Sequence, residues 1–311
     1  MGGKTSGPGG SVPSEAPGGS VTWASIAWQN GDLVPLESLR LSAFSFAALY
    51  GFGLFETVRA YDGVPFALDR HGARMAAGAQ TLGLDCGWLR PEAVREGVGR
   101  VLEANSLPNA VVRLTLTATG QEWEDLLPTL TISVRAFAGY PARWYEEGVD
   151  LVVAPWRRCP EDPVVGLKSA NYLTCLRARE FARRAGGDEA LLLNCRGRAV
   201  EGSVSNLFVV SAEGQLVTPP AEDGLLPGVT RALVLELAAQ NGLATREQSV
   251  SLTEVQAAAE AFVTNSLMEI APVRRIGGEA LPQGPGAMTR LLSRAYRRAV
   301  SEATMGTEPS A

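Results

Sequence analysis

Short apolar runs and alternating apolar and polar residues dominate the first half of the chain. This pattern is typical of β-strands, and it predicts strands over residues 21–28, 53–61, 110–118 and 128–137. Residues 69–84 and 91–104 instead carry apolar side chains at spacings of three and four, which is typical of helices with one buried face. Pro91 suits the first turn of the second helix. This half predicts a small α/β domain.

The second half alternates in the same way. Strands are predicted over residues 149–156, 189–194, 198–202 and 206–210. Helices are predicted over residues 174–185, 228–242 and 287–303. Gly242 is a good residue to end the middle helix, because glycine readily adopts the left-handed conformation. This half predicts a larger, β-rich domain.

Turn-rich and low-complexity stretches predict the domain limits. We expect a small domain over 22–140, an interdomain linker over 141–149 and a large cofactor-binding domain over 150–311. Residues 1–21 are rich in Gly, Pro and Ser and cannot bury a core, so they predict a disordered tail.

Composition and charge exclude several classes of protein. The hydrophobic fraction of 46% and the formal charge of −5 fit a globular protein that does not bind nucleic acid. No apolar run approaches the ~18 residues that a membrane helix needs, and no apolar leader precedes the first strand. The cysteines show no C-x-x-C pair, and the single His71 excludes a multi-histidine metal site. We therefore expect a cytoplasmic protein with reduced thiols, no metal and no membrane partner.

Lysine is nearly absent, and this draws attention to one residue. Of the 28 Lys and Arg residues only Lys4, in the tail, and Lys168 are lysines. A lysine amine can lose its proton when buried and can form a Schiff base, which a guanidinium cannot. Lys168 lies between an apolar run, "VVGL", and a small polar turn, "SAN". The competing interpretation is an ordinary surface lysine.

Glu201 is an isolated acid between two strand-like runs in "RAVEGSVSNLFVV". A carboxylate in such surroundings needs a cationic or N–H partner, or its pKa rises. A protonated pyridine nitrogen is one such partner. The competing interpretation is a loop glutamate at a hairpin.

Two turns could hold a phosphate. In "LLPGVTRALV", Gly228 permits a close backbone approach, and the free N–H groups of the helix start favour an anion, with Thr230 adding a hydroxyl. In "FVTNSLMEIAPV", a strand ends in Thr264, Asn265 and Ser266. Taken alone, these are a capped helix and an ordinary turn. Together with a unique amine and an isolated acid, they suggest pyridoxal 5′-phosphate.

The chain resembles the class IV, or fold-type IV, family of pyridoxal-phosphate-dependent aminotransferases from about Ser25 to Val300. The motifs that carry the resemblance are "YGFGLFETVRAYDGVPFALDRHGARM", "LKSANYL", "EALLLNCRGRAVEGSVSNLFVV", "GLLPGVTRALV" and "TNSLMEIAPV". It implies a mixed α+β and α/β fold with a small N-terminal α/β domain and a larger C-terminal pseudo-barrel domain. It also implies a homodimer with the cofactor between the domains.

The resemblance assigns roles to individual residues. Lys168 matches the Schiff-base lysine and Glu201 the acid on the pyridine nitrogen, so both are expected to be catalytic. Tyr172 matches an aromatic position near the ring, and Arg59 matches the arginine that reaches the phosphate. The remaining expected cofactor contacts are Ser205, Asn206, Gly228, Val229, Thr230, Thr264 and Asn265. His71 and Arg74 match an H-x-x-R helix start, which we interpret as structural or dimer-forming.

The activity within the family is less constrained. D-amino-acid aminotransferases carry an Arg-x-His pair for the substrate carboxylate, which this chain lacks because Asp69 precedes His71 by two residues. Branched-chain aminotransferases usually carry a Tyr-x-Arg-Pro-like strand, whereas here Leu114 follows Arg113. These motifs favour a lyase that converts the small molecule 4-amino-4-deoxychorismate to 4-aminobenzoate and pyruvate in folate biosynthesis. The alternative is a branched-chain or related amino-acid aminotransferase, and a non-enzymatic vitamin-binding protein is a third possibility.

Overall fold

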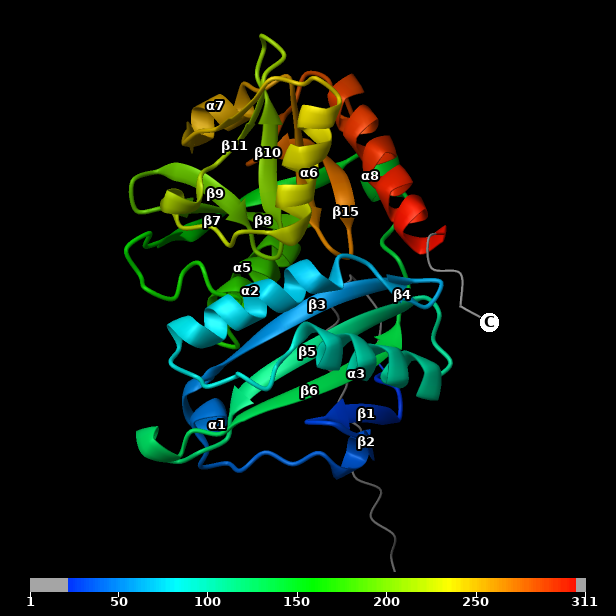
Figure 1. Cartoon of the computed structure of the whole chain (residues 1–311). Coiled ribbons are helices and arrows are strands. Elements are labelled where there is room, and N and C mark those ends of the chain that lie inside the picture. The colour runs from blue at the N-terminus through cyan, green and yellow to red at the C-terminus, as the bar shows by residue number, and fades with distance from the viewer. Residues whose placement is uncertain (1–21, 306–311) are drawn as a thin grey trace, which may run out of the picture.

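The computed structural model describes residues 22–305, which form two β-sheets, one of six strands and one of ten. Figure 1 shows the first sheet below and the second above, with helix α2 at the boundary between them. The predicted disordered tail over residues 1–21 lies outside the described residues.

The first sheet has the strand order β2-β1-β6-β5-β3-β4, and every neighbouring pair is antiparallel. Its strands are β1 (Ile26–Gln29), β2 (Asp32–Pro35), β3 (Gly53–Tyr61), β4 (Val64–Pro65), β5 (Ala110–Ala118) and β6 (Pro128–Ala136). Because side chains alternate along a strand, Leu114 of β5 points into the core while Arg113 points to the other face.

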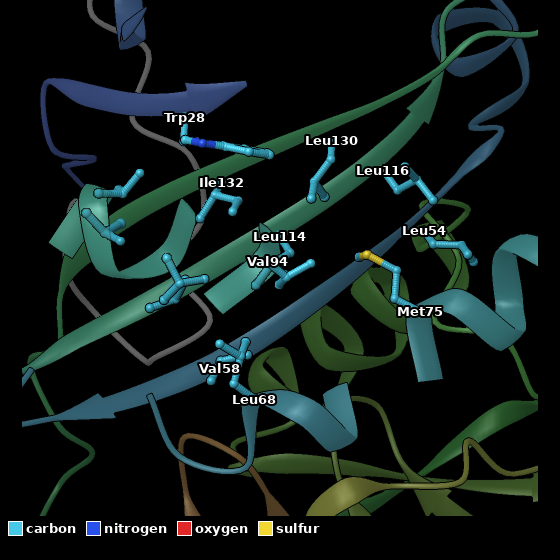
Figure 2. Close-up of a cluster of buried hydrophobic side chains, with 14 of the residues drawn as sticks. Trp28, Leu54, Val58, Leu68, Met75, Val94, Leu114, Leu116, Leu130 and Ile132 are labelled. Atoms are coloured by element: carbon cyan, nitrogen blue, oxygen red, sulfur yellow. The ribbon is translucent and has the colours of Figure 1, made fainter. Parts of the chain in front are cut away.

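Helices cover one face of this sheet. They are α1 (Phe46–Tyr50), α2 (Leu68–Thr81) and α3 (Pro91–Ala104), with short 3-10 turns η1 (Leu36–Ser38) and η2 (Trp123–Asp125). Figure 2 shows the core between them, where Met75 of α2 and Val94 of α3 pack over Leu114 and Ile132. Each such side chain, once fully buried, contributes about 1.5–3 kcal/mol through the hydrophobic effect. The helices thus leave the opposite face of β3, with Phe55 and Thr57, for the second domain.

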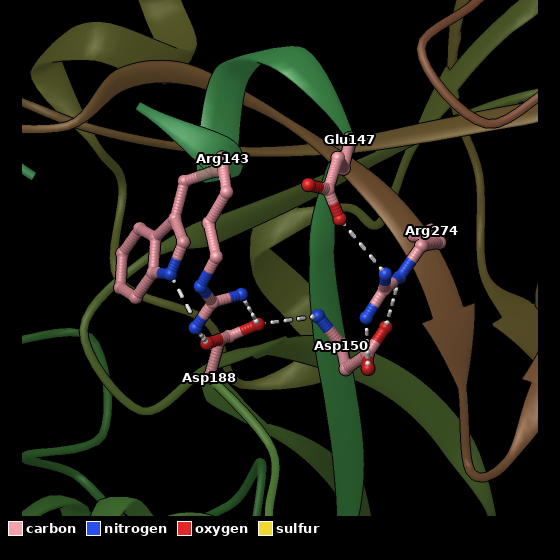
Figure 3. Close-up of polar contacts among 6 residues, drawn as sticks. Arg143, Glu147, Asp150, Asp188 and Arg274 are labelled. Carbon is pink, nitrogen blue, oxygen red and sulfur yellow. Dashed lines mark hydrogen bonds and ion pairs between the residues drawn. The ribbon is translucent and has the colours of Figure 1, made fainter. Parts of the chain in front are cut away.

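The predicted linker over residues 141–149 packs against the second sheet. It contains α4 (Arg143–Glu146), whose Trp144 is buried in the core of the large domain. Figure 3 shows that Arg143 pairs with Asp188, while Arg274 pairs with both Glu147 and Asp150. Asp188 Oδ2 also accepts from the Asp150 backbone N–H at 3.0 Å. The linker is therefore held by two ion pairs, one to Asp188, which directly precedes β8, and one to Arg274 of β15.

The second sheet has the order β12-β11-β10-β14-β15-β7-β8-β9-β13, and β16 pairs with β15. An additional pairing of β10 with β9, at Asn206 opposite Glu201, closes part of it into a barrel. Its strands are β7 (Val149–Arg158), β8 (Glu189–Asn194), β9 (Arg198–Gly202), β10 (Asn206–Val210), β11 (Leu216–Thr218), β12 (Thr245–Glu247), β13 (Val250–Ser251), β14 (Glu260–Asn265), β15 (Glu269–Ile276) and β16 (Glu279–Ala280). Closure removes exposed strand edges at this point, and it brings two predicted site residues together.

Helices surround this barrel. They are α5 (Leu173–Arg184), α6 (Val229–Gln240), α7 (Leu252–Gln256) and α8 (Ala287–Met305), with the 3-10 turn η3 (Ala221–Asp223). Helices α6 and α8 pack over stacked Phe208 and Phe262, whose ring centroids lie 4.9 Å apart. This packing fixes the N-terminus of α6 against the barrel, beside Asn206. Within residues 22–305, no helix is both long and apolar enough to span a bilayer.

Candidate active site

A pocket of about 360 Å³ lies between the two sheets. Strand β3 of the small domain contributes Phe55 and Thr57, and the large domain contributes most of the remaining walls. Of the predicted site residues, all but Arg59 line it: Lys168, Tyr172, Glu201, Ser205, Asn206, Gly228, Val229, Thr230, Thr264 and Asn265. Residues as far apart in sequence as Phe55 and Leu267 therefore meet in one cavity.

Lys168 is positioned by the small domain. The Phe55 N–H donates to the Lys168 carbonyl at 2.9 Å, and the Ala170 N–H donates to the Gly53 carbonyl at 2.9 Å. The Lys168 Nζ lies 4.6 Å from the centroid of the Phe55 ring and 5.9 Å from that of Tyr172. Tyr172 in turn donates its hydroxyl to the Ser203 carbonyl at 3.0 Å. The amine is thus held in the pocket between two aromatic rings.

Glu201 lies at the point where the barrel closes. Its Oε2 accepts from Asn206 Nδ2 and from the Leu226 N–H, each at 3.1 Å, and its Oε1 pairs with Arg158. Burial raises the pKa of Glu201 to about 7, while Arg158 acts in the opposite direction. An additional cation in the pocket would favour the ionised form further. The acid is therefore well suited to face a protonated ring nitrogen.

Glu189 organises the turn that follows Glu201. This buried carboxylate accepts from the Ser203 N–H at 3.1 Å and from the Ser205 hydroxyl at 3.2 Å, and it also pairs with the Ser203 hydroxyl. The Ser205 hydroxyl therefore donates its hydrogen to Glu189, and Ser205 contributes to the wall of the pocket.

Two turns meet at the far end of the pocket. One is the start of α6, where Gly228 is the N-cap and has no side chain to cap the helix. The other is the end of β14, where Thr264 is 1% exposed and its Oγ1 has no hydrogen-bond partner within residues 22–305. Asn265 folds this second turn, because its Oδ1 accepts from the N–H groups of Leu267 and Met268 at 2.9 and 2.7 Å.

Arg59 does not line this pocket but an adjoining cavity of about 10 Å³, which it shares with Val229, Thr230 and Ser266. Its guanidinium lies 3.5 Å from the centroid of the Phe137 ring, and its Nε and Nη1 are buried without a hydrogen-bond partner within residues 22–305. It shares a face of β3 with Phe55 and Thr57. Arg74, which we interpreted as structural or dimer-forming, does line the pocket, and its Nη1 donates to the Pro227 carbonyl at 2.8 Å. Two arginines therefore adjoin the α6 start, Arg74 through the Pro227 carbonyl and Arg59 through the cavity that it shares with Val229 and Thr230.

These features fit pyridoxal 5′-phosphate. The buried hydroxyl of Thr264, the α6 start without a side-chain cap and the buried guanidinium of Arg59 suit a phosphate group. Glu201 and Lys168 line the same pocket, as required of residues that would bind the ring nitrogen and the aldehyde of one cofactor, respectively.

Three residues that sequence reasoning missed support the site. Arg158 holds Glu201, Glu189 holds the turn after it, and Glu56 binds Arg74 through Oε1 at 2.8 Å and Oε2 at 2.6 Å. Arg158 gave no local signal, because it is one of 26 arginines in the chain. Glu56 could have been noticed as an acid on the same face of β3 as the apolar residues Leu54 and Val58.

The chain is similar to known proteins along most of its length. The family model for amino-transferase class IV matches residues 53–276. A Methanocaldococcus jannaschii protein provisionally named a branched-chain-amino-acid aminotransferase is 34% identical, covering 86% of this chain and 94% of its own. The crystal structure of a Thermoproteus uzoniensis branched-chain aminotransferase with norvaline is 32% identical, covers 90% of this chain and 96% of its own, and superposes with a TM-score of 0.81. A T.th. branched-chain amino acid aminotransferase solved with pyridoxamine 5′-phosphate is 27% identical, covers 90% of this chain and 95% of its own, and reaches 0.84.

The prediction of a 4-amino-4-deoxychorismate lyase in folate biosynthesis is wrong, because these relatives are named as aminotransferases. A Legionella pneumophila structure provisionally described as such a lyase is only 24% identical, with a TM-score of 0.77, and it shows the fold alone. The prediction gave weight to Leu114, which is fully buried in the small-domain core. Its identity reflects packing against α2 and α3 and carries no information about the substrate.

The predicted fold, with a small N-terminal domain and a larger β-rich domain closed into a barrel, is confirmed by the superpositions. With a family model matched over residues 53–276 and a relative 34% identical over 272 residues, the chain belongs to the class IV aminotransferase family.

Proposed function

We propose that this protein is a pyridoxal-phosphate-dependent transaminase that acts on branched-chain amino acids. The observation that carries the proposal is the meeting of Lys168, Glu201 and the two phosphate-type turns in one pocket, in a chain 34% identical to a protein provisionally named for that activity. The cofactor is pyridoxal 5′-phosphate.

Each residue of the pocket has a task in this proposal. Lys168 Nζ holds the cofactor aldehyde at rest and moves the proton at the substrate α-carbon during the reaction. Glu201, supported by Arg158 and Asn206, keeps the proton on the ring nitrogen. When bound, the cofactor supplies an electron sink for the charge that develops at the α-carbon. Thr264, Thr230 and Arg59, whose Nε and Nη1 are buried without a partner within the described residues, bind the phosphate.

The pocket also has apolar walls suited to an aliphatic side chain. Val164, Val165, Leu167, Leu192 and Leu267 line it together with the ring of Phe55. Apolar contacts of this kind favour branched aliphatic substrates over polar ones of similar size. A homodimer remains a prediction, and analytical ultracentrifugation of the full chain tests it.

The experiment is amino transfer from leucine, isoleucine and valine to 2-oxoglutarate, measured as glutamate formed. We expect turnover that requires the 2-oxo acid, since a transaminase needs an acceptor to regenerate its cofactor for the next cycle. Alanine, aspartate and a D-amino acid serve as matched donors. If one of them is turned over faster than all three branched-chain amino acids, the substrate assignment is overturned.

A further inference from the structure

Glu56 is a carboxylate of β3 that is completely buried, and both of its oxygens are occupied by side chains of α2. Arg74 donates from Nε to Oε1 at 2.8 Å and from Nη2 to Oε2 at 2.6 Å. His71, itself 1% exposed, places Nδ1 2.6 Å from Oε2. A single carboxylate of the small domain therefore holds two neighbouring side chains of one helix.

Both of these side chains also reach the large domain. Arg74 Nη1 donates to the Pro227 carbonyl at 2.8 Å, immediately before the α6 start. His71 Nε2 lies 3.1 Å from Ser266 Oγ, in the turn after β14. The two turns that would receive a phosphate are thus connected, through Arg74 and His71, to Glu56.

The direction of each proton follows from charge. Burial raises the pKa of Glu56, but the hydrogen bonds from His71 and Arg74 outweigh it and lower the pKa to about 2. Glu56 is therefore ionised and can only accept, so His71 Nδ1 carries the hydrogen. Burial lowers the pKa of His71, which leaves its Nε2 as an acceptor for the Ser266 hydroxyl. Glu56 thus determines, through His71, where the Ser266 hydroxyl points.

We propose that Glu56 is a positioning residue that fixes both phosphate-binding turns, one through Arg74 and the other through His71 and Ser266. The inference rests on the cofactor part of the proposed function. It explains why a charged carboxylate occupies a core position of β3, where burying an unpaired charge would be costly. The small domain thereby completes a phosphate site that is built mainly by the large domain.

The test compares two ligands that differ only in the phosphate. The full chain, freed of cofactor, is titrated with pyridoxamine 5′-phosphate and with pyridoxamine, and binding is followed by fluorescence. In Glu56→Gln we expect the Kd for the phosphorylated ligand to rise by about tenfold or more, because charge-assisted hydrogen bonds are lost. The Kd for pyridoxamine should change by less than about twofold. The ³¹P resonance of the bound phosphate should shift as well.

Glu260→Gln is the matched control. Glu260 is another buried carboxylate, but it accepts from the N–H groups of Met288 and Thr289 at the start of α8, outside the pocket. The Glu260→Gln variant should leave the Kd values for pyridoxamine 5′-phosphate and for pyridoxamine unchanged. If Glu56→Gln weakens both ligands equally, or neither, the positioning role is overturned.

A second set of variants covers the case in which Glu56→Gln does not fold. Ser266→Ala should raise the Kd for pyridoxamine 5′-phosphate, and His71→Ala should add little in the Ser266→Ala background, because both act through one contact. If the effects of Ser266→Ala and His71→Ala on the Kd are fully additive, His71 does not act through Ser266, and that part of the proposal is overturned. No amino-acid substrate enters these titrations, so a failure to turn over branched-chain amino acids leaves their outcome untouched.

Discussion

Gly228 and Asn206 are packed so closely that a Cβ on Gly228 would lie 1.9 Å from Asn206 Oδ1. Asn206 Nδ2 donates to Glu201 at 3.1 Å and to the Leu226 carbonyl at 2.9 Å. The close contact with Asn206 therefore requires a glycine at the α6 start. The backbone conformation does not, because a φ of −72° is open to any residue. Through Asn206, Gly228 connects the α6 start, where we propose that the phosphate binds, to Glu201, which we propose binds the pyridine nitrogen.

This relationship makes Gly228→Ala informative. The added methyl should displace Asn206 and remove its hydrogen bond to Glu201. We therefore expect a lower kcat, weaker cofactor binding and a loss of roughly 1–3 kcal/mol of stability. Gly72→Ala is the control, because Gly72 lies in α2, where a Cβ would meet no described atom within 4 Å apart from its chain neighbours and the backbone of its own helix. It should be neutral or stabilising by up to about 1 kcal/mol. Wild-type turnover in Gly228→Ala would contradict the coupling.

Lys168→Arg tests the amine itself. The variant keeps the positive charge, but a guanidinium cannot hold the cofactor aldehyde or move the proton, so we expect turnover to fall by about 10³-fold or more. Borohydride reduction followed by peptide mapping of the wild type should find the cofactor on Lys168. Finding it on another residue would refute the assignment.

Glu201→Gln should still bind cofactor but lose activity by about 10²-fold or more, because an amide cannot keep the ring nitrogen protonated. The amide oxygen can still accept from Asn206 and Leu226, while the NH2 group then faces Arg158 and that ion pair is lost. Absorbance of the bound cofactor and kcat are measured on the same sample. Near-normal turnover would remove Glu201 from the catalytic residues.

Arg74→Gln and Arg59→Gln distinguish the two arginines. The Nε and Nη1 of Arg59 are buried without a partner within residues 22–305, beside Val229 and Thr230, so its replacement should raise the Kd for pyridoxal 5′-phosphate by about tenfold or more. Arg74 already donates to Glu56 and to the Pro227 carbonyl, so its replacement should have a smaller effect. The reverse order would make Arg74 the phosphate arginine.

The contribution of Glu56 to stability should depend on pH. Because the folded pKa, about 2, lies below the ordinary value of 4.5, the ion pair with Arg74 and the hydrogen bond from His71 stabilise the fold above pH 4.5 and lose this effect as the pH falls toward 2. At neutral pH the contribution is of the order of 3 kcal/mol. The difference in unfolding free energy between the wild type and Glu56→Gln, measured with urea, should shrink as the pH is lowered from neutral toward 2. A difference that stays constant would argue against an ionised Glu56.

Local patterns in the sequence determined most of the secondary structure. The predicted helix over 91–104 matches α3, and the segment over 110–118 matches β5, because periodicity follows directly from which face is buried. Short elements such as β13 (Val250–Ser251) and β16 (Glu279–Ala280) were not predicted, since two residues carry no period. The rarity of lysine and the isolated acid also singled out Lys168 and Glu201, which both line the pocket.

Only the tertiary structure decided which side chains share the pocket. The sequence could not show that Arg59 and Arg74 both adjoin the α6 start, because this depends on how β3 and α2 pack against the large domain. Nor could it show that Glu56, His71 and Ser266 form one connected network, since Ser266 is 195 residues from His71. Local sequence sets the conformation of each segment through periodicity and turn chemistry. Which segments meet depends on the burial of whole faces and on closure of the barrel at Glu201 and Asn206.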